Sequence, residues 1–361
     1  MPTARHDHKH DHKHEHEHAK SVAHGPDPLQ MVFQLATAYV PNAALWVAVE
    51  LDIAGLLAKG PRPVAELSRK TKTDEDALYR ILRLLAMLGI FTETRPRHFG
   101  LTPAAEVLSS AHPRSMRDAL LWIADPFHFQ IAAELMHSVK TGQPTVEHLT
   151  GKSAFEYFPT NPVELDRFHR AMTNLSAMAL GPALEAYDFS PFKTMVDIGG
   201  GHGFAICSLL KKHPRMKGIL FDLKHVVASG EQRIHEENLQ GRCQVMHGDF
   251  FQSVPEGGDL YFMKSIIHDW PDEKAQTILR NCRRALEGKK KGKVLLLEFL
   301  VPPPNQPHPA KVIDIEMLFF PGGRERTEEE FKELFAGAGM RVTRILPTKS
   351  MFSVIEAEVE R

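Results

Sequence analysis

The stretch Val196-Asp197-Ile198-Gly199-Gly200-Gly201-His202-Gly203 decides the fold that we expect for this 361-residue chain. It ends an apolar strand that begins at Thr194 and precedes a helical segment at 204–212. Glycines at such a turn let the backbone reverse tightly and approach a ligand without a Cβ in the way. Dinucleotide-binding dehydrogenases have a related turn, but their GxGxxG spacing is not met here, because the third position falls at Ile206.

The C-terminal half of the chain alternates predicted strands and helices. We expect strands at 194–198, 217–222, 243–247, 260–264 and 293–299, and helices at 204–212, 226–238, 274–286 and 328–336. Thr327, with Glu330 three residues later, should cap the last helix. Two final segments, 341–345 and 352–357, are expected to be edge strands. This alternation predicts an α/β fold, a doubly wound Rossmann-like sheet, in a catalytic domain at 189–361.

The N-terminal part predicts a mostly helical winged-helix domain at 27–112. A helical segment at 28–57, kinked at Pro41, is apolar on several faces, so a partner subunit is its natural cover. Thr73 and Asp76 resemble a capping box at the start of a helix that ends at Gly89. Two short strands, at 90–93 and 98–102, follow this helix. A helical connector at 113–188 should then contribute to a substrate pocket.

A winged helix also raises the alternative of a DNA-binding regulator. Recognition helices offer basic or amide side chains at their N-terminal end to read base edges. Here that end is Asp74-Glu75-Asp76, which would repel phosphates. We therefore interpret the winged helix as a dimerisation module and expect a homodimer.

Composition narrows the remaining classes. The formal net charge is −1, so no global field favours nucleic acid or anionic lipid, and we expect neither as a partner. No stretch reaches ~18 uninterrupted apolar residues, which argues against a membrane span. Three widely spaced cysteines indicate a reducing compartment, and we expect a cytoplasmic protein.

A histidine-rich tract at 6–18 lies in a tail, 1–26, that we expect to be disordered. It is either a loose site for Zn, Ni or Cu or a solvated or cloning-derived extension. We expect no metal elsewhere in the chain.

Acidic residues follow three successive predicted strands. Asp197, Asp222 and Asp249 stand at or just after strand ends, and the carboxyl ends of strands are where open α/β sheets bind ligands. Each acid alone is also explained as a helix cap or a turn residue. Together they describe a site for a nucleoside that carries a cation. His268 follows the fourth strand, and Glu298 and Glu325 are further acids that could surround it.

With these motifs, the chain resembles the plant-type small-molecule O-methyltransferases, the family of the caffeic acid and hydroxyindole O-methyltransferases and of bacterial tailoring enzymes. The resemblance covers about Pro28 to the end and rests on Val196–Gly203, Phe221-Asp222-Leu223, Gly248-Asp249-Phe250, Lys264–Trp270 and Gly322–Phe331. It implies S-adenosylmethionine as cofactor and transfer of its methyl group to a hydroxyl of a small aromatic metabolite.

The resemblance also implies the residues of the site. The general base would be His268, flanked by Glu298 and Glu325. The cofactor contacts would be Ser176, Asp197, Gly199, Gly201, Asp222, Leu223, Asp249, Phe250 and Lys264. The acceptor contacts would be Phe158, Phe168, Met172, Asp269, Met317 and Phe320.

The expected chemistry is in-line displacement by an oxygen nucleophile, which needs alignment and the removal of a proton. A phenol with a pKa near ~10 facing an imidazole near ~6.5 leaves a gap of roughly 5 kcal/mol, and neighbouring carboxylates shrink it. Three residues at two places depart from the family pattern. His202 replaces a frequent Thr or Ser, and Phe319-Phe320 replaces polar residues, which predicts a more apolar acceptor site. Cofactor-assisted hydroxylation or decarboxylation on the same fold stays open as an alternative.

Overall fold

The computed structural model describes residues 27–289 and 291–360. The tail expected to be disordered, 1–26, lies outside the described residues. The chain divides into two units between Pro41 and Asn42. Within the described residues no single helix is long and apolar enough to cross a membrane, and α1 with α2 passes that test only as a pair.

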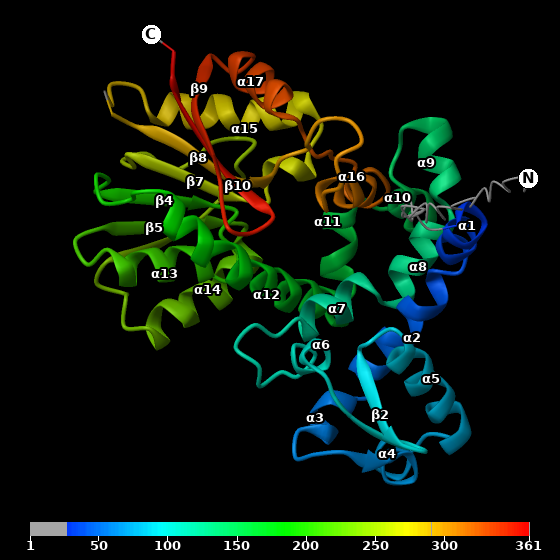
Figure 1. Ribbon diagram of the computed structural model, residues 1–361. Coiled ribbons are helices and arrows are strands. Elements are labelled where there is room, and N and C mark those ends of the chain that lie inside the picture. Colours follow the sequence, from blue (N-terminus) through cyan, green and yellow to red (C-terminus); the bar gives the residue numbers. More distant parts are fainter. Residues whose placement is uncertain (1–26, 290, 361) are drawn as a thin grey trace, which may run out of the picture. The chain divides into compact units, whose positions relative to one another are not determined.

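The N-terminal elements form the predicted winged helix (Figure 1). β3 pairs with both β1 and β2 in a small antiparallel sheet, and α3, α4 and α5 bury Ile53, Leu67 and Leu82 in one core. The elements are α1 (Pro28–Ala36), α2 (Tyr39–Glu50), α3 (Ile53–Leu57), β1 (Arg62–Pro63), α4 (Val64–Thr71), α5 (Glu75–Met87), β2 (Phe91–Arg95), β3 (His98–Leu101) and α6 (Pro103–Glu106).

Two local predictions in this part are wrong. The break between α1 and α2 lies at Thr37, the residue after α1, whereas Pro41 sits in the first turn of α2. Backbone N–H groups of a first turn have no partner within the helix, so proline is tolerated there. Asp74 rather than Thr73 caps α5, since its side chain accepts a hydrogen bond from Ala77 N at 2.8 Å.

The connector is helical, as expected. It contains α7 (Arg117–Ile123), α8 (Pro126–Ala133), α9 (Leu135–Thr141), α10 (Thr145–Thr150), α11 (Ala154–Tyr157), the 3₁₀ turn η1 (Phe158–Thr160) and α12 (Pro162–Ala186). α12 is the longest of these helices and contains Pro182 within it.

The C-terminal part is a seven-stranded sheet with the order β6-β5-β4-β7-β8-β10-β9. The first five strands in this order are parallel, and β10 runs antiparallel to both β8 and β9. The strands are β4 (Thr194–Ile198), β5 (Lys217–Asp222), β6 (Cys243–His247), β7 (Leu260–Lys264), β8 (Lys293–Phe299), β9 (Met340–Pro347) and β10 (Phe352–Val359). β6 and β9 are the edge strands of this sheet, and β10 lies between β8 and β9, so the prediction that 352–357 is an edge strand is wrong.

Helices cover both faces of this sheet (Figure 1). α13 and α14 lie on one face and α15 and α17 on the other. The helices are α13 (Phe204–Lys212), α14 (Lys224–Glu236), α15 (Asp272–Ala285), α16 (Ala310–Phe319) and α17 (Glu328–Ala336), with a 3₁₀ turn η2 (Ile267–Asp269). The capping box predicted for α17 at Thr327 and Glu330 is present. α16 was not expected from the sequence.

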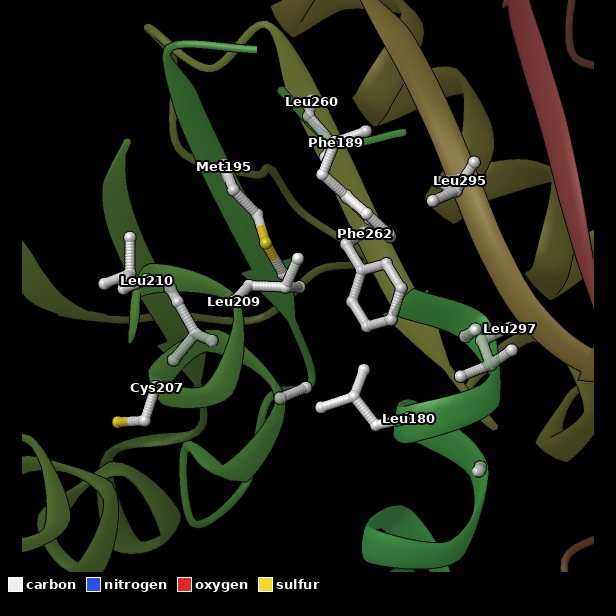
Figure 2. Close-up of a cluster of buried hydrophobic side chains, with 14 of the residues drawn as sticks. Leu180, Phe189, Met195, Cys207, Leu209, Leu210, Leu260, Phe262, Leu295 and Leu297 are labelled. Atoms are coloured by element: carbon white, nitrogen blue, oxygen red, sulfur yellow. The ribbon is translucent and has the colours of Figure 1, made fainter. Parts of the chain in front are cut away.

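Side chains of each central strand alternate between two apolar layers. Met195, Phe262 and Leu297 point toward α12 and α13 (Figure 2), whereas Val196 and Met263 belong to the layer beneath α15 and α17. Because neighbours along a strand are buried on opposite faces, the central strands are mostly apolar, and the buried carboxyl groups of Asp197 and Glu298 near their carboxyl ends are exceptions. This double burial fixes the strand ends that carry the candidate site.

Candidate active site

The glycine-rich loop begins where β4 ends. Gly199 and Gly201 have φ values of +63° and +54°, which favour glycine. A Cβ on Gly199 would lie 2.5 Å from Ile266 Cδ1, so a side chain does not fit there. A Cβ on Gly201 would meet nothing within 4 Å, so this glycine borders open space into which a ligand can come close to the backbone.

Asp197 lies beneath this loop rather than beyond the strand end. It is 2% exposed, and its Oδ2 would lie 2.8 Å from a Cβ on Gly200. Burial raises the pKa of its carboxyl group to about 7. Oδ2 has no hydrogen-bond partner among the described residues. A cationic group of a ligand would supply the missing donor.

The other two acids are held by backbone amides. Asp222 accepts from Gly201 N at 2.9 Å and from Leu223 N at 2.7 Å, and burial raises its pKa. Asp249 accepts from Phe251 N at 2.8 Å. The structure therefore brings Asp222 against the glycine loop and supports the turn interpretation of Asp249 at the same time.

Three further predicted cofactor contacts differ in their surroundings. Phe250 Cε1 would be 3.8 Å from a Cβ on Gly199, so this ring borders the loop. Burial lowers the pKa of Lys264, whose Nζ donates to Ser265 Oγ at 3.3 Å. Ser176 is buried on α12, and its hydroxyl donates to Met172 O at 2.6 Å within the same helix.

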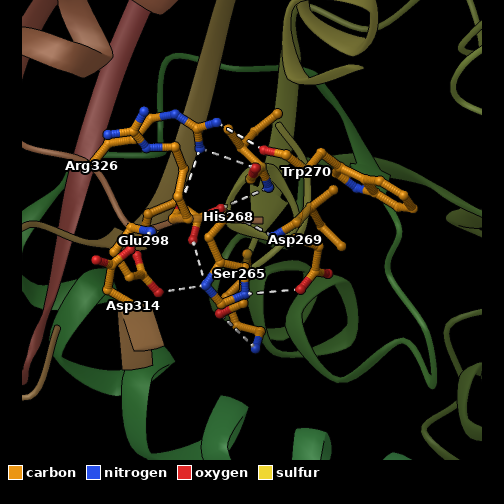
Figure 3. Close-up of polar contacts among 12 residues, drawn as sticks. Ser265, His268, Asp269, Trp270, Glu298, Asp314 and Arg326 are labelled. Carbon is orange, nitrogen blue, oxygen red and sulfur yellow. Dashed lines mark hydrogen bonds and ion pairs between the residues drawn. The ribbon is translucent and has the colours of Figure 1, made fainter. Parts of the chain in front are cut away.

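His268 stands on η2 among three carboxylates (Figure 3). Its Nδ1 lies 2.7 Å from Glu325 Oε1 and 3.8 Å from Glu298 Oε2, and its Nε2 lies 3.5 Å from Asp269 Oδ1. The histidine is 7% exposed, and Glu298 and Glu325 are almost completely buried. The three residues expected to act together are therefore in contact.

The charges of this group oppose the effect of burial on the imidazole. Burial alone would lower the pKa of His268, but Glu298, Glu325 and Asp269 together raise it to about 10. Burial raises the pKa of Asp269 to about 7 and also raises that of Glu298. The ring is therefore an imidazolium at neutral pH, and its proton affinity matches that of a phenol.

Buried polar contacts fix the turn that carries His268. Glu298 Oε1 accepts from Ile266 N at 3.0 Å and from Ile267 N at 2.9 Å. Arg326, 1% exposed, donates to Ile267 O at 3.2 Å and to Trp270 O at 2.8 Å (Figure 3). Sequence reasoning missed Arg326, because the sequence does not reveal that a cation beside Glu325 is buried.

A second missed residue holds Glu325 itself. Asp314 Oδ1, on α16, accepts a hydrogen bond from Glu325 N at 2.9 Å. Ligand atoms of His268, Glu298 and Glu325 all lie within 4.8 Å of one another, so their spacing would also suit a metal ion. That the site needs no metal stays a prediction.

Most predicted acceptor contacts gather in one aromatic cluster. Phe158 stacks on Phe168 at 4.6 Å between ring centroids, and Trp122 lies 5.4 Å from both rings and 5.7 Å from Phe320. Met172 packs against the same cluster. Trp122 was not predicted, although it is buried at the centre of this cluster.

Two predicted acceptor contacts lie elsewhere. Asp269 is beside His268, as described above. Met317, on α16, accepts at its carbonyl oxygen from Gly322 N at 2.9 Å and Gly323 N at 3.1 Å, so it shapes the loop that leads to Glu325.

The departing residue His202 borders a separate open cavity of about 270 Å³. Its ring centroid lies 4.6 Å from that of His169, and Arg170 and Arg233 line the same cavity.

Comparisons with known proteins agree with this architecture. A profile described as the O-methyltransferase domain matches residues 132–341, and one described as the O-methyltransferase dimerisation domain matches 33–111. The phenazine O-methyltransferase PhzM of Lysobacter antibioticus is 40% identical over 335 residues, which cover 92% of this chain and 97% of that protein.

Solved structures give the same result. The crystal structure of LaPhzM has a TM-score of 0.86 at 39% identity, covering 92% of this chain and 100% of that chain. NcsB1, from neocarzinostatin biosynthesis, in complex with S-adenosyl-L-homocysteine and 1,4-dihydroxy-2-naphthoic acid, has a TM-score of 0.77 at 32% identity, covering 91% and 98%.

Proposed function

This chain belongs to the S-adenosylmethionine-dependent O-methyltransferases, and from that premise we propose that His268 is its general base. The supporting observation is the contact of His268 Nδ1 with Glu325 Oε1 at 2.7 Å, in a site where Glu298 and Asp269 add negative charge. The acceptor is a hydroxyl of a small aromatic metabolite.

The residues at the strand ends fit the cofactor. The open space beside Gly201, the Oδ2 of Asp197 that lacks a hydrogen bond within residues 27–289 and 291–360, and the carboxylate of Asp222 against the loop suit a nucleoside with a cationic amino-acid part. Leu223, Asp249, Phe250, Lys264 and Ser176 are proposed as further contacts. When bound, S-adenosylmethionine supplies the electrophilic methyl group.

Glu325 determines which nitrogen of His268 is free to act. A carboxylate 2.7 Å from Nδ1 favours a proton on that nitrogen, so it is Nε2 that is deprotonated in the neutral ring and then accepts the proton of the acceptor hydroxyl. Because the pKa of His268 is about 10, the transfer from a phenol with a pKa of ~10 is nearly balanced. The gap of roughly 5 kcal/mol that a free imidazole would face in this step is thereby removed for the neutral form of His268, whose population increases as the pH rises toward 10.

The aromatic cluster supports a flat, apolar acceptor. Phe158, Phe168, Met172 and Phe320 supply apolar surface, and the relatives named above include a phenazine O-methyltransferase and a complex with a dihydroxynaphthoic acid. The acceptor that we propose is a polycyclic or substituted phenol. Asp269 and Met317 would contact its polar edge.

We also propose that the enzyme is a homodimer. The dimerisation profile covers 33–111, and large apolar side chains on α1, among them Leu29, Phe33 and Leu35, are exposed. Glu75 and Asp76 in the first turn of α5 oppose a DNA-binding role, as the sequence indicated. The cytoplasmic location and the lack of nucleic-acid or membrane partners stay predictions.

A screen of phenolic and polyketide acceptors with methyl-labelled S-adenosylmethionine tests the proposed reaction. We expect label in an aromatic product whose mass increases by one methyl group. An increase by one oxygen atom, or loss of carboxyl carbon, would instead identify the divergent hydroxylase or decarboxylase chemistry. Label on nitrogen or carbon in place of oxygen would contradict the proposed acceptor.

A further inference from the structure

A second buried histidine lies in the aromatic cluster and has no part in the chemistry proposed above. Asp125 caps α8, and its Oδ1 accepts from His128 N at 2.7 Å and lies 3.0 Å from His128 Nδ1. The carboxylate therefore fixes the ring and favours a proton on Nδ1.

The other ring nitrogen faces a second carboxylate, that of Glu316. His128 is 5% exposed, and its Nε2 makes no hydrogen bond within the described part of the chain. Glu316 Oε1, on α16, lies 3.2 Å away but forms only an ion pair with it. The ion pair compensates the charge of the ring, but Nε2 has no acceptor in hydrogen-bond alignment among the described residues, so a ligand oxygen or nitrogen could take that place.

The ring belongs to the wall of the proposed acceptor site. It stacks on Phe320 with centroids 5.3 Å apart and planes at 14°, and its edge meets Trp122 at 4.5 Å. Trp122 in turn contacts Phe158 and Phe168. A flat molecule held by this cluster would thus have one polar neighbour there in addition to His268.

The charge of the group decides what this neighbour can bind. Burial alone would lower the pKa of His128, but Asp125 and Glu316 raise it to about 9. Nε2 therefore carries a proton at neutral pH and is a donor. Because two carboxylates flank the ring, an anionic ligand group is disfavoured, whereas a neutral oxygen or nitrogen lone pair is accommodated.

We propose that His128 is a specificity-determining residue that donates from Nε2 to a neutral carbonyl oxygen or ring nitrogen of the aromatic acceptor. The inference rests on the proposed function, because it names a second substituent of that acceptor. The substrate class becomes heteroaromatic or quinone-like phenols in place of purely hydrocarbon phenols.

A matched pair of probes tests this directly. 2-Hydroxyphenazine and 2-hydroxyanthracene have the same shape, and only the first has ring nitrogens. Their dissociation constants are measured by calorimetry on the full chain saturated with S-adenosylhomocysteine. The preference for the phenazine is the dissociation constant of 2-hydroxyanthracene divided by that of 2-hydroxyphenazine. Dividing the wild-type preference by that of each variant cancels the difference in hydrophobicity between the two probes.

Two variants of His128 distinguish a hydrogen bond from Nε2 to the acceptor from the contact of Nδ1 with Asp125. In His128→Asn the amide reaches Asp125, as Nδ1 does, but nothing replaces Nε2. In His128→Gln the longer side chain reaches the Nε2 position and abandons Asp125. We expect Asn to reduce the preference by about ten-fold or more and Gln to keep part of it. Thermal unfolding of both variants checks that the chain is folded.

The opposite order of the two variants, or an unchanged preference in His128→Asn, would overturn the inference, as would failure of 2-hydroxyphenazine to bind the wild type. Methyl transfer to 2-hydroxyphenazine, measured in parallel with labelled cofactor, tests the proposed function separately. Bound but unmethylated phenazine would count against that function, and the binding preference would still decide the role of His128.

Discussion

Replacing Glu325 by glutamine removes one negative charge from beside His268 and keeps a hydrogen-bond acceptor. The carboxylate lies 2.7 Å from Nδ1, and a glutamine oxygen can take the same place. His268 must be neutral at Nε2 to accept a proton, and its raised pKa of about 10 means that kcat should increase with pH toward that value. In Glu325→Gln the pKa of His268 falls, so the same increase should occur at lower pH.

The size of the shift follows from the contact. A hydrogen bond to a charged group contributes about 1.5–3 kcal/mol against about 1 kcal/mol for a neutral pair, a difference of about 0.5–2 kcal/mol. At about 1.4 kcal/mol per pKa unit, this difference lowers the pKa by about one unit. The Coulomb energy of two charges ~4 Å apart, about 4 kcal/mol at an effective dielectric constant of ~20, sets an upper limit of about three units.

The variant should therefore be no slower than the wild type at low pH and a few-fold slower at the high-pH plateau, because its base is weaker. The two kcat–pH profiles, recorded with saturating cofactor and acceptor, should cross. Glu329→Gln, an exposed carboxylate on α17, is the matched control and should leave the profile unchanged. Parallel profiles, lower by one factor at every pH, would refute the reasoning, because they indicate damage to the site in place of a changed pKa.

Three further predictions concern binding and stability. Gly199→Ala should lower the free energy of unfolding by about 1–3 kcal/mol and weaken cofactor binding, because φ is +63° and the new Cβ would meet Ile266. Thermal unfolding and calorimetry measure the two effects. The control Gly241→Ala, at a glycine with open space around it, should change neither. Arg326→Ala should lower the free energy of unfolding by about 3 kcal/mol in urea, because it leaves buried carbonyl oxygens without donors, and a loss below about 1 kcal/mol would contradict that role. Glu356, whose pKa falls from 4.5 to about 2, should stabilise the chain fully above pH 4.5 and lose this contribution as pH falls toward 2, so Glu356→Gln should flatten that part of the pH–stability curve.

The sequence was sufficient for the parts of the fold where burial is two-sided and turns are marked. The bounds of β4, β5, β6, β7 and β8 are as predicted, and for β4, β5 and β7 the reason is a short apolar run that ends at a glycine or a charged residue. β10 was misjudged because its order in the sheet depends on pairing with β8, a contact that no local pattern reveals. The helix cap at Asp74 was misplaced by one residue because Thr73 and Asp74 are both good caps.

The candidate site also has a part that the sequence predicted and a part that it did not. The contact of His268 with Glu325 and Glu298 was expected, because all three follow strands or loops at one edge of the sheet. The partnership of His128 with Glu316 was not, because it joins two helices far apart in the chain. The pKa of about 10 for His268 was also beyond sequence reasoning, since it depends on how completely the carboxylates are buried.

The most direct test of the central claim is methyl transfer by His268→Ala, measured in a single turnover with the acceptor found in the screen. Exposed His235 provides the matched control, His235→Ala. We expect His268→Ala to bind S-adenosylmethionine as the wild type does in calorimetry and to transfer methyl about 10²–10⁴-fold more slowly. An unchanged transfer rate, with cofactor binding intact, would contradict the assignment of His268 as the base.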